Sequence, residues 1–173
     1  MLHVYTGNGK GKTTAALGLA IRALGWRKKV LIVQLLKGRE TGESTLFEYL
    51  ESQGFPVKYI QIGPKRLINL KSPPKDVVEI ISKGLDKVLK VINIFKPELI
   101  ILDELNVVLA YKIVPLEKAF KLIEAAEKVG AEIVLTGRKA PKEIVNLADL
   151  VTEMKKIKHY FDKGVAAKKG IEY

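Results

Sequence analysis

Ten residues near the start of the chain combine glycines, lysines and threonines in the spacing of a phosphate-binding loop, or P-loop. The stretch is Tyr5-Thr6-Gly7-Asn8-Gly9-Lys10-Gly11-Lys12-Thr13-Thr14. Glycines let backbone N–H groups turn toward a ligand, and these groups attract phosphate oxygens together with the dipole of the following helix. We expect the ammonium of Lys12 between phosphates and the hydroxyl of Thr13 on Mg²⁺. The stretch therefore predicts nucleotide binding through Gly7, Asn8, Gly9, Lys10, Gly11, Lys12, Thr13 and Thr14.

This P-loop departs from the strict pattern at one position. The strict pattern has a glycine five residues before Gly11, where this chain has Thr6, and the first glycine comes one residue later at Gly7. The alternative interpretation is a glycine-rich turn that only caps a helix. Because Gly-Lys-Thr-Thr follows directly on the β-rich run Leu2–Thr6, nucleotide binding is the favoured interpretation.

An acidic pair follows a buried run later in the chain. The apolar residues Leu99–Leu102 end in Asp103 and Glu104, which is the Walker B pattern. In that pattern the aspartate holds Mg²⁺ directly or through water, whereas the alternative is an acidic pair that caps the next helix. Glu104 could orient an attacking water, help to bind the metal or contact the ribose.

Three further polar residues follow predicted strands or lie in the tail. Gln34 falls near the end of a strand over residues 30–36, and Arg138 follows a strand over 133–135. Arg138 could clamp a phosphate with two hydrogen bonds, and the alternative is a surface arginine at a turn. His159 lies in a basic segment, where a histidine is more often a surface or packing residue than a catalyst.

Strands and helices alternate along the chain. We predict strands at 2–6, 30–36, 57–62, 99–102, 133–135 and 150–154, and helices at 13–24, 42–53, 74–95, 115–129 and 140–147. Residues 63–74 contain three prolines and are predicted to form a loop. The alternation predicts an α/β fold of the RecA-like P-loop NTPase type, an open, mostly parallel sheet with helices on both faces. Ligands bind such sheets beyond the carboxyl ends of the strands, where all the candidate residues fall, so a single site is predicted.

Length and composition limit the possibilities further. The 173 residues predict one P-loop nucleotide-binding domain over 1–173, with a basic C-terminal tail at about 155–173. The chain has no cysteine, which excludes disulfides and thiolate metal sites and fits a cytoplasmic location. No apolar run reaches the length that spans a bilayer, so no membrane association is expected. The net charge of +11 favours anionic partners.

Taken together, these motifs resemble the ATP:corrinoid adenosyltransferases, the cob(I)yrinic acid a,c-diamide adenosyltransferases of cobalamin biosynthesis. The resemblance covers nearly the whole chain, and the late first glycine of the P-loop is itself the form found in that family. It rests on Tyr5–Thr14, Val33–Gly38, Leu102–Leu105, Thr136–Arg138, Ala148–Met154, Lys158–Gly164 and Gly170–Tyr173.

The resemblance implies an unusual use of ATP as an alkylating agent. Reduced Co(I) of a corrinoid attacks the 5′ carbon of the ribose, and intact triphosphate leaves with Mg²⁺. The implied catalytic residues are Lys12, Thr13 and Glu104; Thr13, Asp103 and Glu104 are the implied metal ligands, and Gln34 and Arg138 are added to the P-loop as nucleotide ligands. The expected partners are ATP, the corrinoid and a reductant protein that supplies Co(I), in a homodimer.

Two segments are expected to border the corrinoid. One is the loop Gly63–Lys71, which leaves the end of a strand and carries the cations Lys65, Arg66 and Lys71; the other is the tail around His159. Family members commonly have an aromatic-rich segment after the third strand, but residues 62–71 of this chain contain no aromatic residue.

Three other functions remain open from the residues alone. The first is a RecA-like ATPase that acts on nucleic acid, although few aromatic residues lie near the basic runs for base stacking, so no specific nucleic-acid partner is expected. The second is a P-loop kinase of small molecules, which would produce ADP and a phosphorylated acceptor. The third is a regulatory subunit that binds MgATP without turnover.

Overall fold

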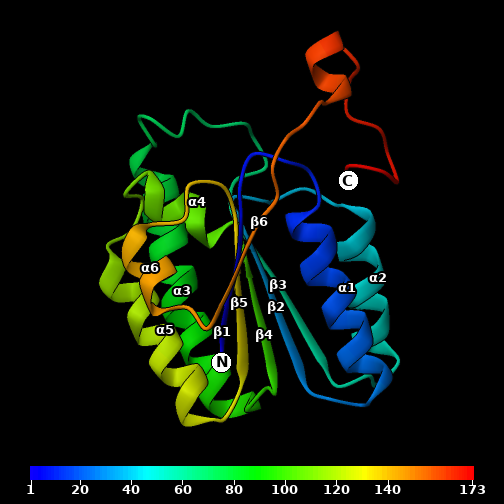
Figure 1. The fold of residues 1–173 in the computed structure, drawn as a ribbon. Helices are drawn as coiled ribbons and strands as arrows, with labels where there is room; N and C mark the ends of the chain where they lie inside the picture. Colours follow the sequence, from blue (N-terminus) through cyan, green and yellow to red (C-terminus); the bar gives the residue numbers. More distant parts are fainter.

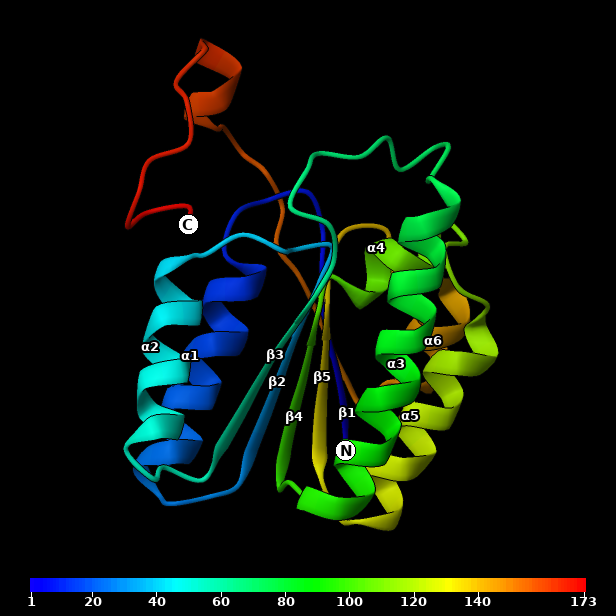
Figure 2. The same ribbon diagram turned by 180° about the vertical axis from the view of Figure 1, so that it is seen from behind.

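A computed structural model describes all residues 1–173 and has a single parallel sheet between two layers of helices (Figures 1 and 2). The six strands are β1 (Leu2–Thr6), β2 (Val30–Leu35), β3 (Val57–Ile62), β4 (Leu99–Asp103), β5 (Glu132–Thr136) and β6 (Leu150–Glu153). Their order is β3-β2-β4-β5-β1-β6, and every neighbouring pair is parallel. The predicted α/β architecture is confirmed, and all six strands lie where the sequence predicted them, with ends that differ by at most one residue.

The helices divide between the two faces of the sheet. They are α1 (Lys12–Gly25), α2 (Gly42–Ser52), α3 (Lys75–Phe95), α4 (Leu105–Ala110), α5 (Leu116–Lys128) and α6 (Lys142–Leu147), with a short 3₁₀ helix at Tyr160–Lys163. In Figure 1, α1 and α2 cover one face, and α3 to α6 lie on the other. None of these helices combines the length and the apolar character that a membrane span requires.

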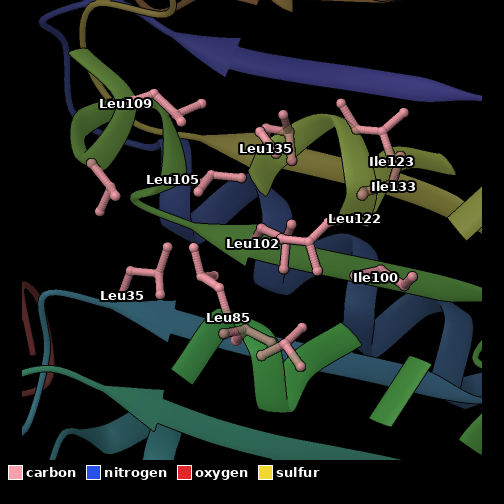
Figure 3. Close-up of a cluster of buried hydrophobic side chains, with 14 of the residues drawn as sticks. Leu35, Leu85, Ile100, Leu102, Leu105, Leu109, Leu122, Ile123, Ile133 and Leu135 are labelled. Atoms are coloured by element: carbon pink, nitrogen blue, oxygen red, sulfur yellow. The ribbon is translucent and has the colours of Figure 1, made fainter. Parts of the chain in front are cut away.

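The central strand β4 is buried on both faces, which explains its continuous apolar run. Ile100 and Leu102 point into the larger cluster of core residues under α3 and α5, whereas Leu99 and Ile101 point into the smaller cluster under α1 and α2. Figure 3 shows Leu102 among side chains of the larger cluster, including Leu85 of α3 and Leu122 of α5. Strands covered on both faces are continuous apolar runs, and in β4 this run leads directly to Asp103.

Helix α4 and the 3₁₀ helix are the two elements that the sequence did not predict. Five of the six residues of α4 are buried, so its sequence has no alternation of apolar and polar residues that marks a surface helix. The residue before it, Glu104, has a φ of 64°. This left-handed conformation turns the chain sharply from β4 into α4, and the Glu104 side chain is thereby turned toward the end of the sheet where the P-loop lies.

Candidate active site

A cavity of about 690 Å³ lies beyond the carboxyl ends of the strands, around the loop between β1 and α1. Most of the predicted site residues line it: Asn8, Gly9, Lys10, Gly11, Lys12, Thr13, Thr14, Glu104 and Arg138. Gly7, Gln34 and Asp103 do not line it. The P-loop, the Walker B glutamate and the arginine after β5 are therefore brought together in one place.

The P-loop contacts the chain at the end of the last strand, β6. Gly7 and Gly11 have φ values of 95° and 118°, which residues with a Cβ adopt only with strain. The backbone N–H of Gly9 donates to the carbonyl of Met154, just after β6, at 2.6 Å. The late first glycine thus lies in a loop that packs closely against the residue that follows β6.

Lys12 is almost fully buried beneath this loop, with 8% of its surface exposed. Its ammonium donates to the carbonyl of Gly9 at 2.6 Å. Burial, and then the charge of Arg138, lower the pKa of the Lys12 ammonium. A cation held in this way gains an anionic partner when a phosphate enters the cavity, and this favours binding.

The close contact between Gly9 and the residue after β6 allows a test of whether this contact positions the P-loop. A Cβ at Gly9 would lie 2.6 Å from the carbonyl oxygen of Met154, so we expect Gly9→Ala to lower the free energy of unfolding by about 2 kcal/mol and to weaken ATP binding. Gly18→Ala is the matched control, because a Cβ at this exposed position within α1 meets nothing within 4 Å. It should raise stability by about 1 kcal/mol through helix propensity. Urea unfolding of both variants measures the contrast, and equal effects of the two changes would contradict it.

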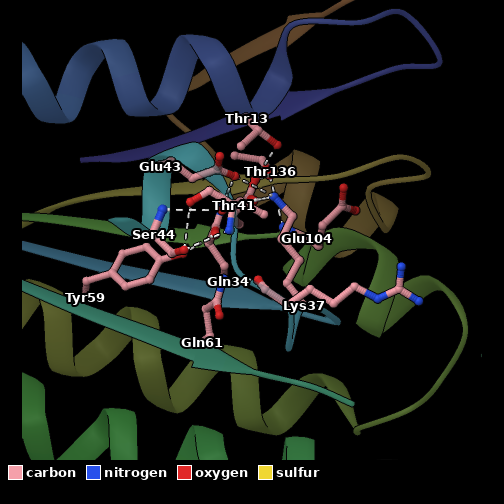
Figure 4. Close-up of polar contacts among 12 residues, drawn as sticks. Thr13, Gln34, Lys37, Thr41, Glu43, Ser44, Tyr59, Gln61, Glu104 and Thr136 are labelled. Atoms are coloured by element: carbon pink, nitrogen blue, oxygen red, sulfur yellow. Dashed lines mark hydrogen bonds and ion pairs between the residues drawn. The ribbon is translucent and has the colours of Figure 1, made fainter. Parts of the chain in front are cut away.

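Asp103 is fully buried, and all of its acceptor capacity is used by four donors from four segments. Figure 4 labels the four donor residues, which are Thr13, Gln34, Lys37 and Thr136. Oδ1 accepts from the hydroxyl of Thr13 at 2.8 Å and from that of Thr136 at 2.6 Å. Oδ2 accepts from the amide of Gln34 and the ammonium of Lys37, each at 3.1 Å. The Walker A threonine and the Walker B aspartate therefore touch, as the predicted metal site requires.

Gln34 lies behind this carboxylate rather than in the cavity. It is fully buried, and its amide group also donates to Glu43 at 3.2 Å and accepts from the hydroxyl of Tyr59. These contacts give Gln34 the role of holding Asp103. It does not line the cavity, and its predicted contact with the nucleotide stays a prediction.

Lys37 and Glu43 line the cavity but were absent from the predicted site. Burial by itself would lower the pKa of Lys37, but the carboxylate of Asp103 outweighs it, and the pKa is raised. Burial would likewise raise the pKa of Glu43, but hydrogen bonds from its own backbone N–H and from Gln34 lower it. The sequence could have indicated both residues, because Lys37 follows the end of β2 by two residues and Glu43 lies in the first turn of α2.

Glu104 is joined to the end of β5. Its backbone N–H donates to the Thr136 hydroxyl at 3.0 Å, and the same hydroxyl donates to Asp103. Burial, and then the neighbouring charge of Asp103, raise the pKa of the Glu104 carboxyl. The buried amide of Asn106, which the sequence did not indicate, lies 3.4 Å from the carbonyls of both Leu135 and Gly137 and so holds the turn that leads to Arg138.

The tail returns over the P-loop. Lys10 donates to the carbonyl of Ile171 at 3.0 Å and to the carboxylate of Glu172 at 3.2 Å. A second cavity of about 520 Å³ lies under the tail and shares Asn8, Arg138, His159 and Glu172 with the first. Its other lining residues are Lys156, Tyr160, Phe161, Asp162, Val165 and Ala167. His159, expected at the surface or in packing, thus lies at the junction of two cavities, and its Nδ1 accepts from the backbone N–H of Phe161 at 3.1 Å.

The loop Gly63–Lys71 lies elsewhere. Figure 2 shows it beside the top of α3, whereas the tail lies above α1. None of its residues lines either cavity, and Arg66 is paired with Asp76 at 2.7 Å. The two segments expected to border the corrinoid are therefore on different sides of the P-loop.

The residues at the P-loop fit a magnesium ion held partly by its substrate. The protein contains no cluster of three or more His, Cys, Asp or Glu side chains that could hold a metal by itself. Mg²⁺ is usually held through one or two carboxylates together with substrate phosphates and water. The hydroxyl of Thr13 and the carboxylates of Asp103 and Glu104 are oxygen donors of the required kind.

The sheet order, the P-loop and the Walker B residues define a P-loop NTPase fold of the RecA-like type. A KaiC-like protein from the archaeon Pyrococcus horikoshii has a similar structure, with a TM-score of 0.55 and 17% identity over 91% of this chain and 74% of that one. At that identity the likeness supports the fold alone.

The particular family follows from the sequence comparisons. The family model for ATP:corrinoid adenosyltransferase BtuR/CobO/CobP matches residues 1–173. Corrinoid adenosyltransferase CobA of Salmonella typhimurium is 36% identical over 98% of this chain and 84% of its own length. A corrinoid adenosyltransferase of Escherichia coli K12 is 35% identical, with the same two coverages. The chain belongs to the ATP:corrinoid adenosyltransferase family; it is an enzyme with ATP and a corrinoid as substrates, as the motifs predicted.

Proposed function

We propose that this enzyme transfers the 5′-deoxyadenosyl group of ATP to the Co(I) centre of a corrinoid and releases triphosphate, as a step of adenosylcobalamin biosynthesis. The observation that carries the proposal is the pair of adjoining cavities, one around the P-loop and one under the tail, with Arg138 and His159 at their junction. Such an arrangement suits a reaction in which two bound substrates meet.

The reaction needs little proton transfer from the protein. Co(I) supplies the electron pair of the new Co–C bond, the bond between C5′ and oxygen breaks, and the oxygen keeps its electron pair as part of triphosphate. The task of the protein is to align the two substrates and to stabilise the departing charge. Lys12, the N–H groups of the P-loop and Arg138 are placed for the second role.

We propose Thr13, Asp103 and Glu104 as the residues that hold Mg²⁺, with Lys12, Thr13 and Glu104 as the catalytic set. Bound there, the metal would neutralise part of the charge on the leaving triphosphate. Glu104 needs no role as a general base in such a reaction, because Co(I) is a strong nucleophile without activation. Its place in the cavity suits contact with the metal or the ribose.

The cavity under the tail is the proposed place of the corrinoid. Phe161 is 71% exposed and Tyr160 36%, and both line this cavity. Aromatic rings suit the flat face of a macrocycle, while Arg138 and Lys156 suit its amide and carboxylate arms. The loop Gly63–Lys71 could contact the corrinoid only from the other side of the P-loop.

We propose further properties of the enzyme beyond its reaction. The enzyme would act as a single nucleotide-binding domain over residues 1–173, as a homodimer in the cytoplasm, and would receive Co(I) through a reductant protein. Specific nucleic-acid binding is not proposed.

The phosphate product distinguishes the proposed reaction from hydrolysis and from kinase activity. With ATP, Mg²⁺ and reduced corrinoid under anaerobic conditions, we expect the phosphorus NMR pattern of triphosphate to grow in step with adenosylated corrinoid. A hydrolase or a kinase cleaves at the γ-phosphorus, so it would produce ADP. Stoichiometric ADP with an unchanged corrinoid would reject the proposed function, and binding without turnover would favour a regulatory subunit.

A further inference from the structure

Asp103 has no free position for a divalent cation while Lys37 stays in place. A carboxylate offers about four acceptor positions, and those of Asp103 are filled by Thr13, Gln34, Thr136 and Lys37. The first three donors are neutral groups fixed on α1, β2 and β5. Lys37 is the charged one, lies on the turn after β2, and has a flexible side chain that also lines the nucleotide cavity.

Lys37 also contacts the other carboxylate at this side of the cavity. Its ammonium lies 3.4 Å from Glu43 and 3.1 Å from Asp103, so one cation is shared between two anions. Glu43 and Asp103 would repel each other without it. A lysine and a divalent cation placed on the same carboxylate oxygens would repel each other as well, so the two cations compete for Asp103.

We propose that Lys37 is an internal counter-ion, which holds Asp103 and Glu43 in the nucleotide-free enzyme and moves to the triphosphate of ATP as the divalent cation reaches Asp103. The inference rests on the proposed MgATP site. The cavity offers Lys37 a second anionic partner only when a nucleotide is present, because triphosphate would lie among the P-loop residues that share this cavity with Lys37.

The consequence is a coupling between metal and nucleotide. Without ATP, Lys37 keeps the divalent cation away from Asp103; with ATP, the triphosphate draws Lys37 off and opens one position on the carboxylate. By linkage, each ligand must then favour the binding of the other by the same factor. If Lys37 were removed, Asp103 would bind the divalent cation even in the absence of nucleotide.

Two binding measurements on the full chain, with no corrinoid present, test this inference. Mn²⁺ is titrated without nucleotide and followed by the electron paramagnetic resonance signal of free Mn²⁺. ATP is titrated by calorimetry twice, once in the presence of a chelator and once with Mn²⁺ in excess. We expect Lys37→Met to bind Mn²⁺ about tenfold more tightly and ATP about tenfold more weakly than the unaltered enzyme, and these opposite signs are what a counter-ion predicts.

Two further variants control the measurement. Lys37→Arg keeps the charge and should stay close to the unaltered enzyme in both titrations. Lys58→Met removes a lysine that pairs with Glu51 of α2 at the surface, and should change neither. Circular dichroism melting curves establish that each variant is folded.

The outcomes separate this inference from the proposed metal site. If Lys37→Met binds Mn²⁺ no more tightly than the unaltered enzyme, the competition for Asp103 is rejected, whatever happens to ATP. If ATP binding in the chelator is unchanged, the transfer of Lys37 to triphosphate is rejected. If ATP affinity of the unaltered enzyme does not respond to Mn²⁺ at all, the metal part of the proposed function fails, and the inference fails with it.

Discussion

Lys12→Ala is expected to reduce kcat/KM for ATP by roughly a thousandfold while leaving the fold intact. The ammonium is the buried cation of the P-loop, and its hydrogen-bond partner within the protein is the carbonyl of Gly9. Burial lowers the pKa of this group because it destabilises the charged form. A bound phosphate would offset the free-energy cost of burying that charge. Removing it takes away attraction for the triphosphate both before and during its departure.

The measurement is ATP affinity by calorimetry together with the rate of adenosylation. Lys10→Ala is the matched control, because Lys10 lies in the same loop but is bound to Glu172 of the tail and is partly exposed. Its effect should be much smaller. Glu104→Gln should also cost less than Lys12→Ala, since an alkyl transfer needs no activated water. Unchanged ATP affinity in Lys12→Ala would overturn the assignment of the P-loop.

Asp103→Ala is expected to have the largest effect on stability, a loss of about 3 kcal/mol in the free energy of unfolding, and to abolish activity. The change would leave the hydroxyls of Thr13 and Thr136 without their acceptor, and would leave the amide of Gln34 and the ammonium of Lys37 with Glu43 alone. Three of these donors lie at the ends of different elements, so their loss loosens the junction between β2, β4 and β5.

Urea unfolding without nucleotide or metal measures this loss. Asp162→Ala is the control, because Asp162 forms an exposed pair with Lys156 in the tail and such pairs contribute little. Asp103→Asn keeps the shape but replaces one acceptor with a donor, so it should lie between the two in stability. Equal stability of Asp103→Ala and Asp162→Ala would show that the buried network around Asp103 does not stabilise the carboxyl end of the sheet.

The strands and the P-loop could be predicted because local signals specify them. The apolar run of β4 and the stripe of Val77, Ile81, Leu85, Val88 and Ile92 on α3 are visible in the sequence, and all of these helix residues are buried. Helix α4 could not be predicted, because its burial on all sides removes the alternation on which such a prediction depends.

The network around Asp103 depends on tertiary structure and was only partly predictable. Gln34 was correctly placed near the end of β2, but its direction toward Asp103 and Tyr59 depends on the register of three neighbouring strands. Lys37 returns to Asp103 because Leu36 adopts a φ of 60° and turns the chain. Nothing in the residue type of Leu36 indicates that turn, since leucine rarely adopts a positive φ.

The position of β1 in the sheet has a consequence for how the enzyme is made. The P-loop follows β1, yet β1 lies between β5 and β6, and its first backbone N–H bonds to Asp149, 147 residues further along the chain. On a ribosome, β1 therefore emerges long before either neighbour exists. Until β5 and β6 are made, the apolar residues of β1 have no strand to pair with and are exposed to non-native contacts. Closing such distant contacts is slow, so the ability to bind ATP is expected to be among the last properties that a newly made molecule acquires.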